Sequence, residues 1–229
     1  GSVFVALRGM KSDGRMFTDQ AIAAGAVAVV AEQAPEEAVS VPWIVVSNTR
    51  VALACLATEY HDHPSSRLTV VGITGTNGKT TTSYLLSKVF EAAGYRCGLM
   101  GTVTYRIGSR EFSSTRTTPE APDLQGFLGE MVREGCDACA MEVSSHALAL
   151  HRVSGTRFSA GIFTNLGRDH LDFHLTMEEY FSAKKRLFEM LPDDAPAVVN
   201  IDDPRGSSIV KLVQRPVTYA IDHLADVTP

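Results

Sequence analysis

The sequence has few of the features that mark secreted, membrane and nucleic-acid-binding proteins. Its 229 residues include only four cysteines and one tryptophan. Four cysteines are too few for the disulfide framework of a small secreted domain, and they favour a reducing, cytoplasmic location. The longest uncharged apolar run, Ala21 to Ala31, is too short and too rich in alanine and glycine to cross a bilayer. The first residues do not resemble a signal peptide, so we expect neither secretion nor a membrane partner.

The charge of the chain argues against another class of partner. The formal net charge is −5, with 21% charged and 45% hydrophobic residues. An acidic chain of ordinary globular composition offers no electrostatic footprint for nucleic acid or for an anionic membrane. The length suits one large domain or two smaller ones, and we expect a monomer.

Two of the cysteines, Cys136 and Cys139, form a CxxC pair. A structural zinc site of this type needs four ligands, and the sequence has no second pair. Because Cys139 also lies within an apolar run, we interpret both as buried thiols rather than zinc ligands.

The stretch from Leu68 to Thr81 carries the strongest functional signal. Leu68 to Ile73 is uncharged and rich in β-branched residues, as in a buried strand, and a glycine-rich turn and a helix follow. This order forms a phosphate-binding loop, in which backbone N–H groups and the helix dipole favour an anion. We expect Lys79 to reach the β- and γ-phosphates of ATP and the Thr80 hydroxyl to bind Mg²⁺. The predicted ATP-binding residues are Gly75, Thr76, Asn77, Gly78, Lys79, Thr80 and Thr81.

The loop departs from the common motif in one respect, because Ile73 stands where the first glycine usually falls. The alternative is an ordinary strand–turn–helix that happens to contain a lysine. The following helix has apolar residues at Tyr84, Leu85, Val89 and Phe90, and this amphipathic context favours the nucleotide site.

The remaining pattern predicts an α/β fold. Strands are expected at 3–7, 27–31, 43–46, 68–73, 97–101, 138–143, 160–165, 197–201 and 217–221, and helices at 17–24, 81–93, 124–134, 177–188 and 207–213. A further helix runs through Val51, Leu53, Leu56 and Tyr60, with Asn48 or Thr49 as its cap. We place a domain boundary at the polar segment 61–66, whose adjacent histidines do not converge on one metal ion. The prediction is a small N-terminal α/β domain at 1–63, then a P-loop ATPase-type central domain at 67–229 with a mostly parallel sheet flanked by helices.

Polar residues follow two of the predicted central strands, where ligands bind in such sheets. Glu142 ends an apolar strand and either cross-links the structure or coordinates the metal of the nucleotide; beside a phosphate loop we favour the metal. His170 lies in the polar run 168–174, which is equally a hydrogen-bonded turn or part of a site.

Lys184 lies in the middle of an apolar helical stripe. At about 100° per residue, Tyr180, Phe181, Leu187 and Phe188 share the helix face that contains it. An unpaired buried ammonium is costly. Lys184 must therefore pair with an acid, be chemically changed, or extend past the stripe to solvent.

Five segments occur in the order found in the Mur ligase family, and the chain resembles that family over nearly its whole length. They are 75–81, 117–119, 141–146, 164–166 and 168–172. The opening segment 3–9 and Asp13-Gly14-Arg15 are similar to the N-terminal nucleotide-sugar domain of these enzymes.

The resemblance implies an ATP-dependent ligase of peptidoglycan biosynthesis. Such a ligase adds the third amino acid, meso-diaminopimelate or L-lysine, to UDP-N-acetylmuramoyl-L-alanyl-D-glutamate through an acyl phosphate. Its partners are ATP, that UDP-linked dipeptide and the amino acid, and its metal cofactor is Mg²⁺.

The resemblance also assigns roles to residues. It implies catalytic roles for Lys79, His170 and Lys184, the last carbamylated so that its new carboxylate helps to bind a second Mg²⁺. The implied metal ligands are Thr80, Glu142, His170 and Lys184, and the implied contacts to the muramoyl-dipeptide are Thr117, Thr118, Ser144 and Arg152. Arg116 stands where some relatives carry asparagine, and Met10-Lys11-Ser12 are candidates for contacts to the uridine end.

Parts of the family pattern lie outside this sequence. We expect the start of the N-terminal domain and the amino-acid-binding C-terminal domain to be missing, and the remaining chain to bind ATP and Mg²⁺ without forming an amide bond alone. The segment 202–205 resembles an amino-acid-selecting motif of the lost domain, but we interpret it as a turn after a strand. The alternatives are a folylpolyglutamate synthase-like ligase and a non-catalytic nucleotide-binding module.

Overall fold

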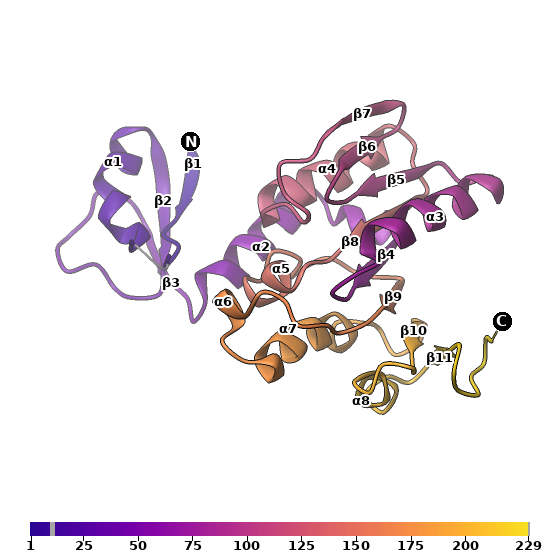
Figure 1. Cartoon of the computed structure of the whole chain (residues 1–229). Coiled ribbons are helices and arrows are strands. Elements are labelled where there is room, and N and C mark those ends of the chain that lie inside the picture. Colours follow the sequence, from indigo (N-terminus) through magenta and orange to yellow (C-terminus); the bar gives the residue numbers. More distant parts are fainter. Residues whose placement is uncertain (10–11, 229) are drawn as a thin grey trace.

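The computed structural model describes residues 1–9 and 12–228 (Figure 1), so the candidate uridine contacts Met10 and Lys11 lie outside the described residues. The chain begins with an all-parallel sheet in the order β1 (Ser2–Val5), β2 (Ala26–Ala31), β3 (Trp43–Val45). Between the first two strands the chain forms a 3₁₀ turn, η1 (Gly14–Phe17), and α1 (Thr18–Ala23). The α/β character predicted for this part of the sequence is confirmed.

The long helix α2 (Thr49–Tyr60) begins where the sequence predicts. The side chain of Asn48 accepts hydrogen bonds from the backbone N–H groups of Arg50 and Val51, which satisfies two donors that the first helical turn leaves free. The polar segment after α2 forms a tight turn and a second 3₁₀ turn, η2 (Pro64–Arg67), before the next sheet begins.

The larger sheet has eight strands in the order β11-β10-β9-β4-β8-β5-β6-β7. Their bounds are β4 (Thr69–Thr74), β5 (Cys97–Met100), β6 (Thr104–Ile107), β7 (Arg110–Ser113), β8 (Ala138–Glu142), β9 (Ala160–Phe163), β10 (Ala197–Asn200) and β11 (Pro216–Tyr219). The strand pairs are parallel except β5–β6 and β6–β7, which are antiparallel and place the β6–β7 hairpin at one edge. The predicted mostly parallel sheet is therefore confirmed, and the hairpin is an element that the sequence patterns did not predict.

Helices cover both faces of this sheet, as Figure 1 shows. They are α3 (Lys79–Ala92), α4 (Ala121–Arg133), α5 (Ser145–Ala149), α6 (Leu171–His174), α7 (Met177–Glu189) and α8 (Gly206–Val210). Alternate residues of β8 enter different cores: Ala138 and Ala140 face the core that includes side chains of α3, and Cys139 and Met141 face the core of α4 and α7.

The predicted apolar face of α3 is wrong in part. Leu85 and Val89 are each 63% exposed, whereas Ser83 and Ser87 are buried. Small residues on the buried face let the helix backbone lie close to the sheet, and this packing requirement outweighs the apolar periodicity. The prediction of buried thiols at Cys136 and Cys139 is confirmed, and 202–205 forms the expected turn after β10.

The topology fixes where a ligand can bind. β4 lies between β8 and β9, with Ile73 paired to Glu142 on one side and to Ile162 on the other. The carboxyl ends of the three strands therefore meet, and the loops that follow them share one edge of the sheet. Among the residues that the structure describes, no helix is long and apolar enough to cross a membrane.

Candidate nucleotide site at the carboxyl ends of β4, β8 and β9

A cavity of about 310 Å³ opens where these three strands end. Most of the residues singled out in the sequence line it, although they come from distant segments. The lining residues are Thr76, Asn77, Gly78, Lys79, Thr80, Thr102, Thr117, Glu142, Ser144, Ser145, His170 and Lys184. Four other predicted site residues are not among those that line the cavity. Gly75 and Thr81 belong to the same loop and helix start, whereas Thr118 and Arg152 lie elsewhere.

The glycine-rich loop is braced by the residues that follow β9. The backbone N–H of Thr76 donates to the Asn165 carbonyl at 2.8 Å, and that of Asn77 donates to Asn165 Oδ1 at 3.0 Å. Gly75 has a φ of +148°, and a Cβ there would overlap the hydroxyl of Thr164. Glycine is therefore required at this position by both conformation and space. Asn165 lies in a segment that resembles the family, but its contact with the loop was not predicted, because its partner is 88 residues away in the chain.

Two lysines share one backbone carbonyl of the loop. Lys79 Nζ donates to the Gly75 carbonyl at 2.9 Å and to the Thr76 carbonyl at 2.8 Å, while Lys184 Nζ donates to the Gly75 carbonyl at 2.6 Å. Lys184 is 1% exposed, so it does not extend past the apolar stripe to solvent, and its ammonium lies 4.4 Å from the centre of the Tyr180 ring. Burial, with the nearby charge of Lys79, lowers the pKa of Lys184 to about 7. Burial also lowers the pKa of Lys79.

Glu142 is fully buried at the end of β8, on the strand face that looks toward α3. Thr102 holds both of its carboxylate oxygens: the backbone N–H donates to Oε1 at 2.9 Å and the hydroxyl to Oε2 at 3.0 Å. Gly101 leaves the space that the carboxylate occupies, since a Cβ at that position would overlap Oε1. Neither Gly101 nor Thr102 carries a recognisable sequence signal.

Three histidines, His146, His170 and His174, cluster at the cavity, and His170 lines it. The imidazole of His170 is 44% exposed and packs edge-on against His146, with ring centres 4.8 Å apart. His174 is buried, and its Nε2 lies 2.9 Å from the Ser145 hydroxyl. Burial lowers the pKa of His174 to about 4, so this ring is neutral near pH 7. The sequence patterns pointed to His170 but not to the cluster around it.

The two threonines before α4 have different surroundings. Thr117 lines the cavity, and its hydroxyl lies 3.0 Å from that of Thr102. Thr118 is 1% exposed; its hydroxyl donates to the Glu142 carbonyl at 2.9 Å and accepts from the Ser144 backbone N–H at 3.0 Å. Thr118 therefore braces the end of β8 rather than facing the cavity.

Arg152 is also engaged within the protein. Its guanidinium forms an ion pair with Glu120 at 2.9 Å and donates to the Thr118 carbonyl at 3.3 Å. Its buried Nε has no hydrogen-bond partner among residues 1–9 and 12–228. Ser144 caps α5 by accepting a hydrogen bond from the Ala147 backbone N–H at 3.2 Å.

The charges of the cavity suit a polyphosphate with a divalent cation. Two ammonium groups, those of Lys79 and Lys184, accompany the Glu142 carboxylate. Among the described residues, no three acidic, histidine or cysteine side chains are gathered closely enough to hold a metal by themselves. Mg²⁺ characteristically takes one or two carboxylates and completes its shell with phosphate oxygens and water. Glu142 and the Thr80 hydroxyl fit that pattern.

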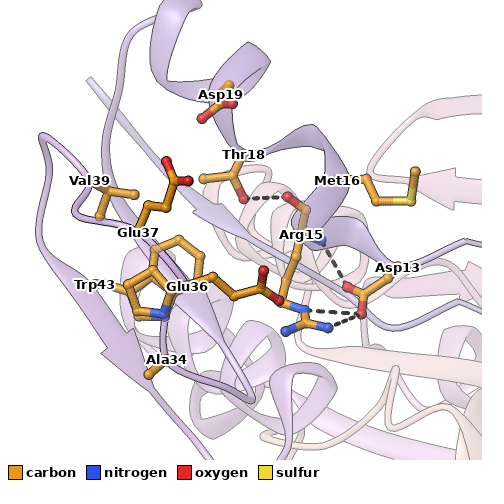
Figure 2. Close-up of a pocket in the computed structure, with 11 residues that line it drawn as sticks. Asp13, Arg15, Met16, Thr18, Asp19, Ala34, Glu36, Glu37, Val39 and Trp43 are labelled. Carbon is orange, nitrogen blue, oxygen red and sulfur yellow. Dashed lines mark hydrogen bonds and ion pairs between the residues drawn. The ribbon is translucent and has the colours of Figure 1, made fainter.

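A second cavity, of about 410 Å³, lies in the N-terminal part beside Trp43 (Figure 2). Its charged lining residues are Asp13, Arg15, Asp19, Glu36 and Glu37. Arg15 is paired with Asp13 at 2.9 Å, so the wall is acidic on balance. An acidic wall disfavours a diphosphate, and we assign no phosphate site there.

Comparison with known proteins identifies the family of the chain. The family profile described as the Mur ligase middle domain matches residues 73–228, which is more than half of the chain. The chain belongs to the Mur ligase family. A second profile, described as the Mur ligase family catalytic domain, matches residues 1–61.

The named relatives within the Mur ligase family point to one member. A UDP-N-acetylmuramoyl-L-alanyl-D-glutamate–2,6-diaminopimelate ligase from Cytophaga hutchinsonii is 44% identical over 99% of this chain and 47% of its own length. The chain thus spans about half the length of this relative. A solved structure of a ligase of the same name superposes with a TM-score of 0.84 at 30% identity, covering all of this chain and 47% of the other.

The alternative of a folylpolyglutamate synthase-like ligase has only the fold in its favour. A structure of E. coli FolC in complex with DHPP and ADP covers 74% of this chain with a TM-score of 0.51 and 18% identity. A likeness at that identity shows a shared fold and says nothing of the reaction.

Proposed function

We propose that this chain is the nucleotide-binding part of an ATP-dependent ligase that adds 2,6-diaminopimelate to UDP-N-acetylmuramoyl-L-alanyl-D-glutamate. One observation carries the proposal: a phosphate loop, a buried carboxylate and a buried lysine share one cavity. The name of the relative that matches nearly the whole chain supports the choice of substrate. By the same likeness, we assign the N-terminal residues 1–63 to the UDP end and residues 67–229 to ATP.

The proposed reaction has two steps. The glutamate carboxylate attacks the γ-phosphorus of ATP; an oxygen–phosphorus bond forms while the bond to the ADP oxygen breaks, which gives an acyl phosphate. The amino group of diaminopimelate then attacks the acyl carbon, phosphate leaves, and the new amide loses a proton. Such phosphoryl transfer depends mostly on positioning and on stabilising charge.

In this scheme Lys79 exchanges its two loop carbonyls for phosphate oxygens when ATP binds. The exchange keeps the ammonium paired, and the N-terminus of α3 supplies further N–H donors to the phosphates. Lys184 stays on the Gly75 carbonyl. Its lowered pKa leaves a substantial neutral fraction near pH 7, and the neutral amine is the form that adds to CO₂ to give a carbamate and a proton.

We assign Glu142, Thr80, His170 and carbamylated Lys184 to Mg²⁺. The metal would neutralise charge on the transferring phosphoryl group. Carbamylation suits the site because it replaces a second cation with an anion beside Glu142 and leaves one N–H on Nζ for the Gly75 carbonyl. We assign Thr117, Ser144 and Arg152 to the UDP-linked dipeptide, and Thr118 to supporting them.

Calorimetry with ATP and Mg²⁺ tests the nucleotide site. Lys79→Ala removes charged hydrogen bonds and should weaken binding about 10- to 100-fold. Lys88→Ala is the matched control, because Lys88 lies on the same helix, is exposed, and pairs with Glu91. Equal affinities for the two variants would contradict the assignment.

Phosphate release with the UDP-linked dipeptide tests the reaction in the whole protein. We expect release with diaminopimelate and little with lysine. Release with neither amino acid, despite tight ATP binding, would favour a non-catalytic nucleotide-binding module. Mass spectrometry should show one added CO₂ on Lys184 at neutral pH that is lost on acidification.

A further inference from the structure

We propose that Thr102 is a positioning residue that orients Glu142 toward the metal and fixes the hydroxyl of Thr117 as a hydrogen-bond acceptor for the substrate. The inference rests on the proposed function in one respect, because it takes Glu142 as an ionised metal ligand. It concerns a residue that neither the sequence motifs nor the family resemblance singled out.

The Glu142 carboxylate accepts two hydrogen bonds from Thr102. An ionised carboxylate only accepts hydrogen bonds. The backbone N–H of Thr102 donates to one oxygen and its hydroxyl donates to the other. Each oxygen thus keeps a lone pair for a cation, while the plane of the carboxylate is held at two points. A buried ligand held in this way needs no rearrangement when the metal arrives.

A threonine hydroxyl has a single proton, so it can donate only one hydrogen bond. Thr102 gives its proton to Glu142, so in its contact with Thr117 at 3.0 Å it must be the acceptor. Thr117 is therefore the donor, and its own proton is directed to the Thr102 oxygen rather than to a ligand. The hydroxyl of Thr117 can then offer only lone pairs to a ligand.

The orientation of the Thr117 hydroxyl restricts which substrate groups can bind it. A group that binds Thr117 must be a donor, such as the amide N–H of a peptide or an O–H, and not a carboxylate or a phosphate. The UDP-linked dipeptide contains such amide N–H groups beside its carboxylates. The hydrogen-bonded relay Thr117–Thr102–Glu142 thus fixes the Thr117 hydroxyl as an acceptor. It also connects the residue that orients the substrate to the proposed metal ligand.

Thr102→Val tests the positioning role, because valine keeps the shape and the backbone N–H but removes the hydroxyl. Thr102→Ser should restore the wild-type behaviour. Thr104→Val is the matched control: its buried hydroxyl donates to the Phe112 carbonyl in the same edge region and does not touch Glu142. Melting temperatures of all three show whether any variant fails to fold.

The readout that a structural role would not move is binding of Mn²⁺ with a non-hydrolysable ATP analogue, followed by electron paramagnetic resonance in the whole protein. We expect Thr102→Val to weaken Mn²⁺ binding about tenfold or more. Thr104→Val and Thr102→Ser should stay within about twofold of wild type. Unchanged Mn²⁺ affinity in Thr102→Val would overturn the positioning role.

A double-mutant cycle tests the polarity of Thr117. Thr102→Val should raise the KM for the UDP-linked dipeptide in the wild-type background. In a Thr117→Val background it should leave the KM unchanged, because Thr102 then has no Thr117 hydroxyl to orient. The loss of Mn²⁺ affinity should persist in both. Additive effects on KM would overturn the relay.

These experiments distinguish a failure of the proposed function from a failure of the role of Thr102. If the wild-type protein binds neither the Mn²⁺–nucleotide nor the UDP-linked dipeptide, the proposed function falls and this inference falls with it. If the wild type binds both and Thr102→Val matches it, only the role of Thr102 is refuted.

Discussion

Gly101→Ala should disable the proposed metal site while leaving the fold intact. A Cβ at residue 101 would overlap Glu142 Oε1 and lie 3.1 Å from Cδ and 3.3 Å from Cγ. A comfortable carbon–oxygen contact is about 3.3–3.6 Å, so the carboxylate must move by about 1 Å. The side chain is fully buried and held at both oxygens by Thr102, so this movement breaks at least one of those hydrogen bonds.

The expected magnitudes differ for stability and for function. Overpacking of this kind costs about 1–3 kcal/mol of folding free energy, which a stable domain tolerates. A misplacement of about 1 Å at a catalytic group lowers the rate on the order of 100-fold. We therefore expect a small fall in melting temperature together with a large fall in kcat and in Mn²⁺ affinity.

The assay compares Gly101→Ala with Gly129→Ala in the whole protein. Gly129 lies within α4, where the nearest atom to an added Cβ is 3.5 Å away. Alanine in a helix interior is favoured over glycine by about 0.5–1 kcal/mol, so the control should melt higher and keep its metal affinity. Wild-type Mn²⁺ affinity in Gly101→Ala, or a crystal structure of that variant with Glu142 in place, would refute the reasoning.

Two further predictions concern the loop and the histidine cluster. Gly75→Ala should abolish ATP binding, since the added Cβ overlaps Thr164; Gly94→Ala, with φ of +88° but nothing within 4 Å, isolates the backbone strain and should keep binding. Burial lowers the pKa of His174 from 6.5 to about 4, so between these values the unfolded chain binds a proton that the folded chain does not. Unfolding free energy should therefore fall by up to ~3 kcal/mol as pH falls from 6.5 to 4. His174→Gln should flatten this slope in urea titrations, and His63→Gln, at an exposed position, should not; an unchanged slope in His174→Gln would contradict the assignment.

The parts of the fold that local chemistry dictates were predictable. The central strand β4 is an uncharged run, and the order of strand, glycine turn, Lys-Thr pair and helix identifies the loop from local sequence alone. The β6–β7 hairpin gave no such signal, because Arg106, Arg110 and Glu111 break its apolar pattern; the free edge of β5 supplies the pairing instead. Tertiary context outweighs local preference at a sheet edge.

The candidate site divides in the same way. Glu142 and Lys184 were visible because each is a charge in apolar surroundings, which is physically conspicuous in a sequence. Thr102 was not, because a threonine after a strand is ordinary; Asn165 lies in one of the segments that resemble the family, but its hydrogen bonds to the glycine loop were not predicted. Their importance lies in contacts with residues 40 and 88 positions away, and no local pattern encodes such distances.

The interleaved order of the sheet has a consequence for biosynthesis. The glycine loop leaves the ribosome early, but its brace, Asn165, follows 88 residues after Asn77, and Lys184 follows 109 residues after Gly75. A nascent chain stopped before β9 carries the loop without its support. On the proposed function, we therefore expect ATP binding to require the chain through α7, because Asn165 braces the loop and Lys184 on α7 donates to the Gly75 carbonyl.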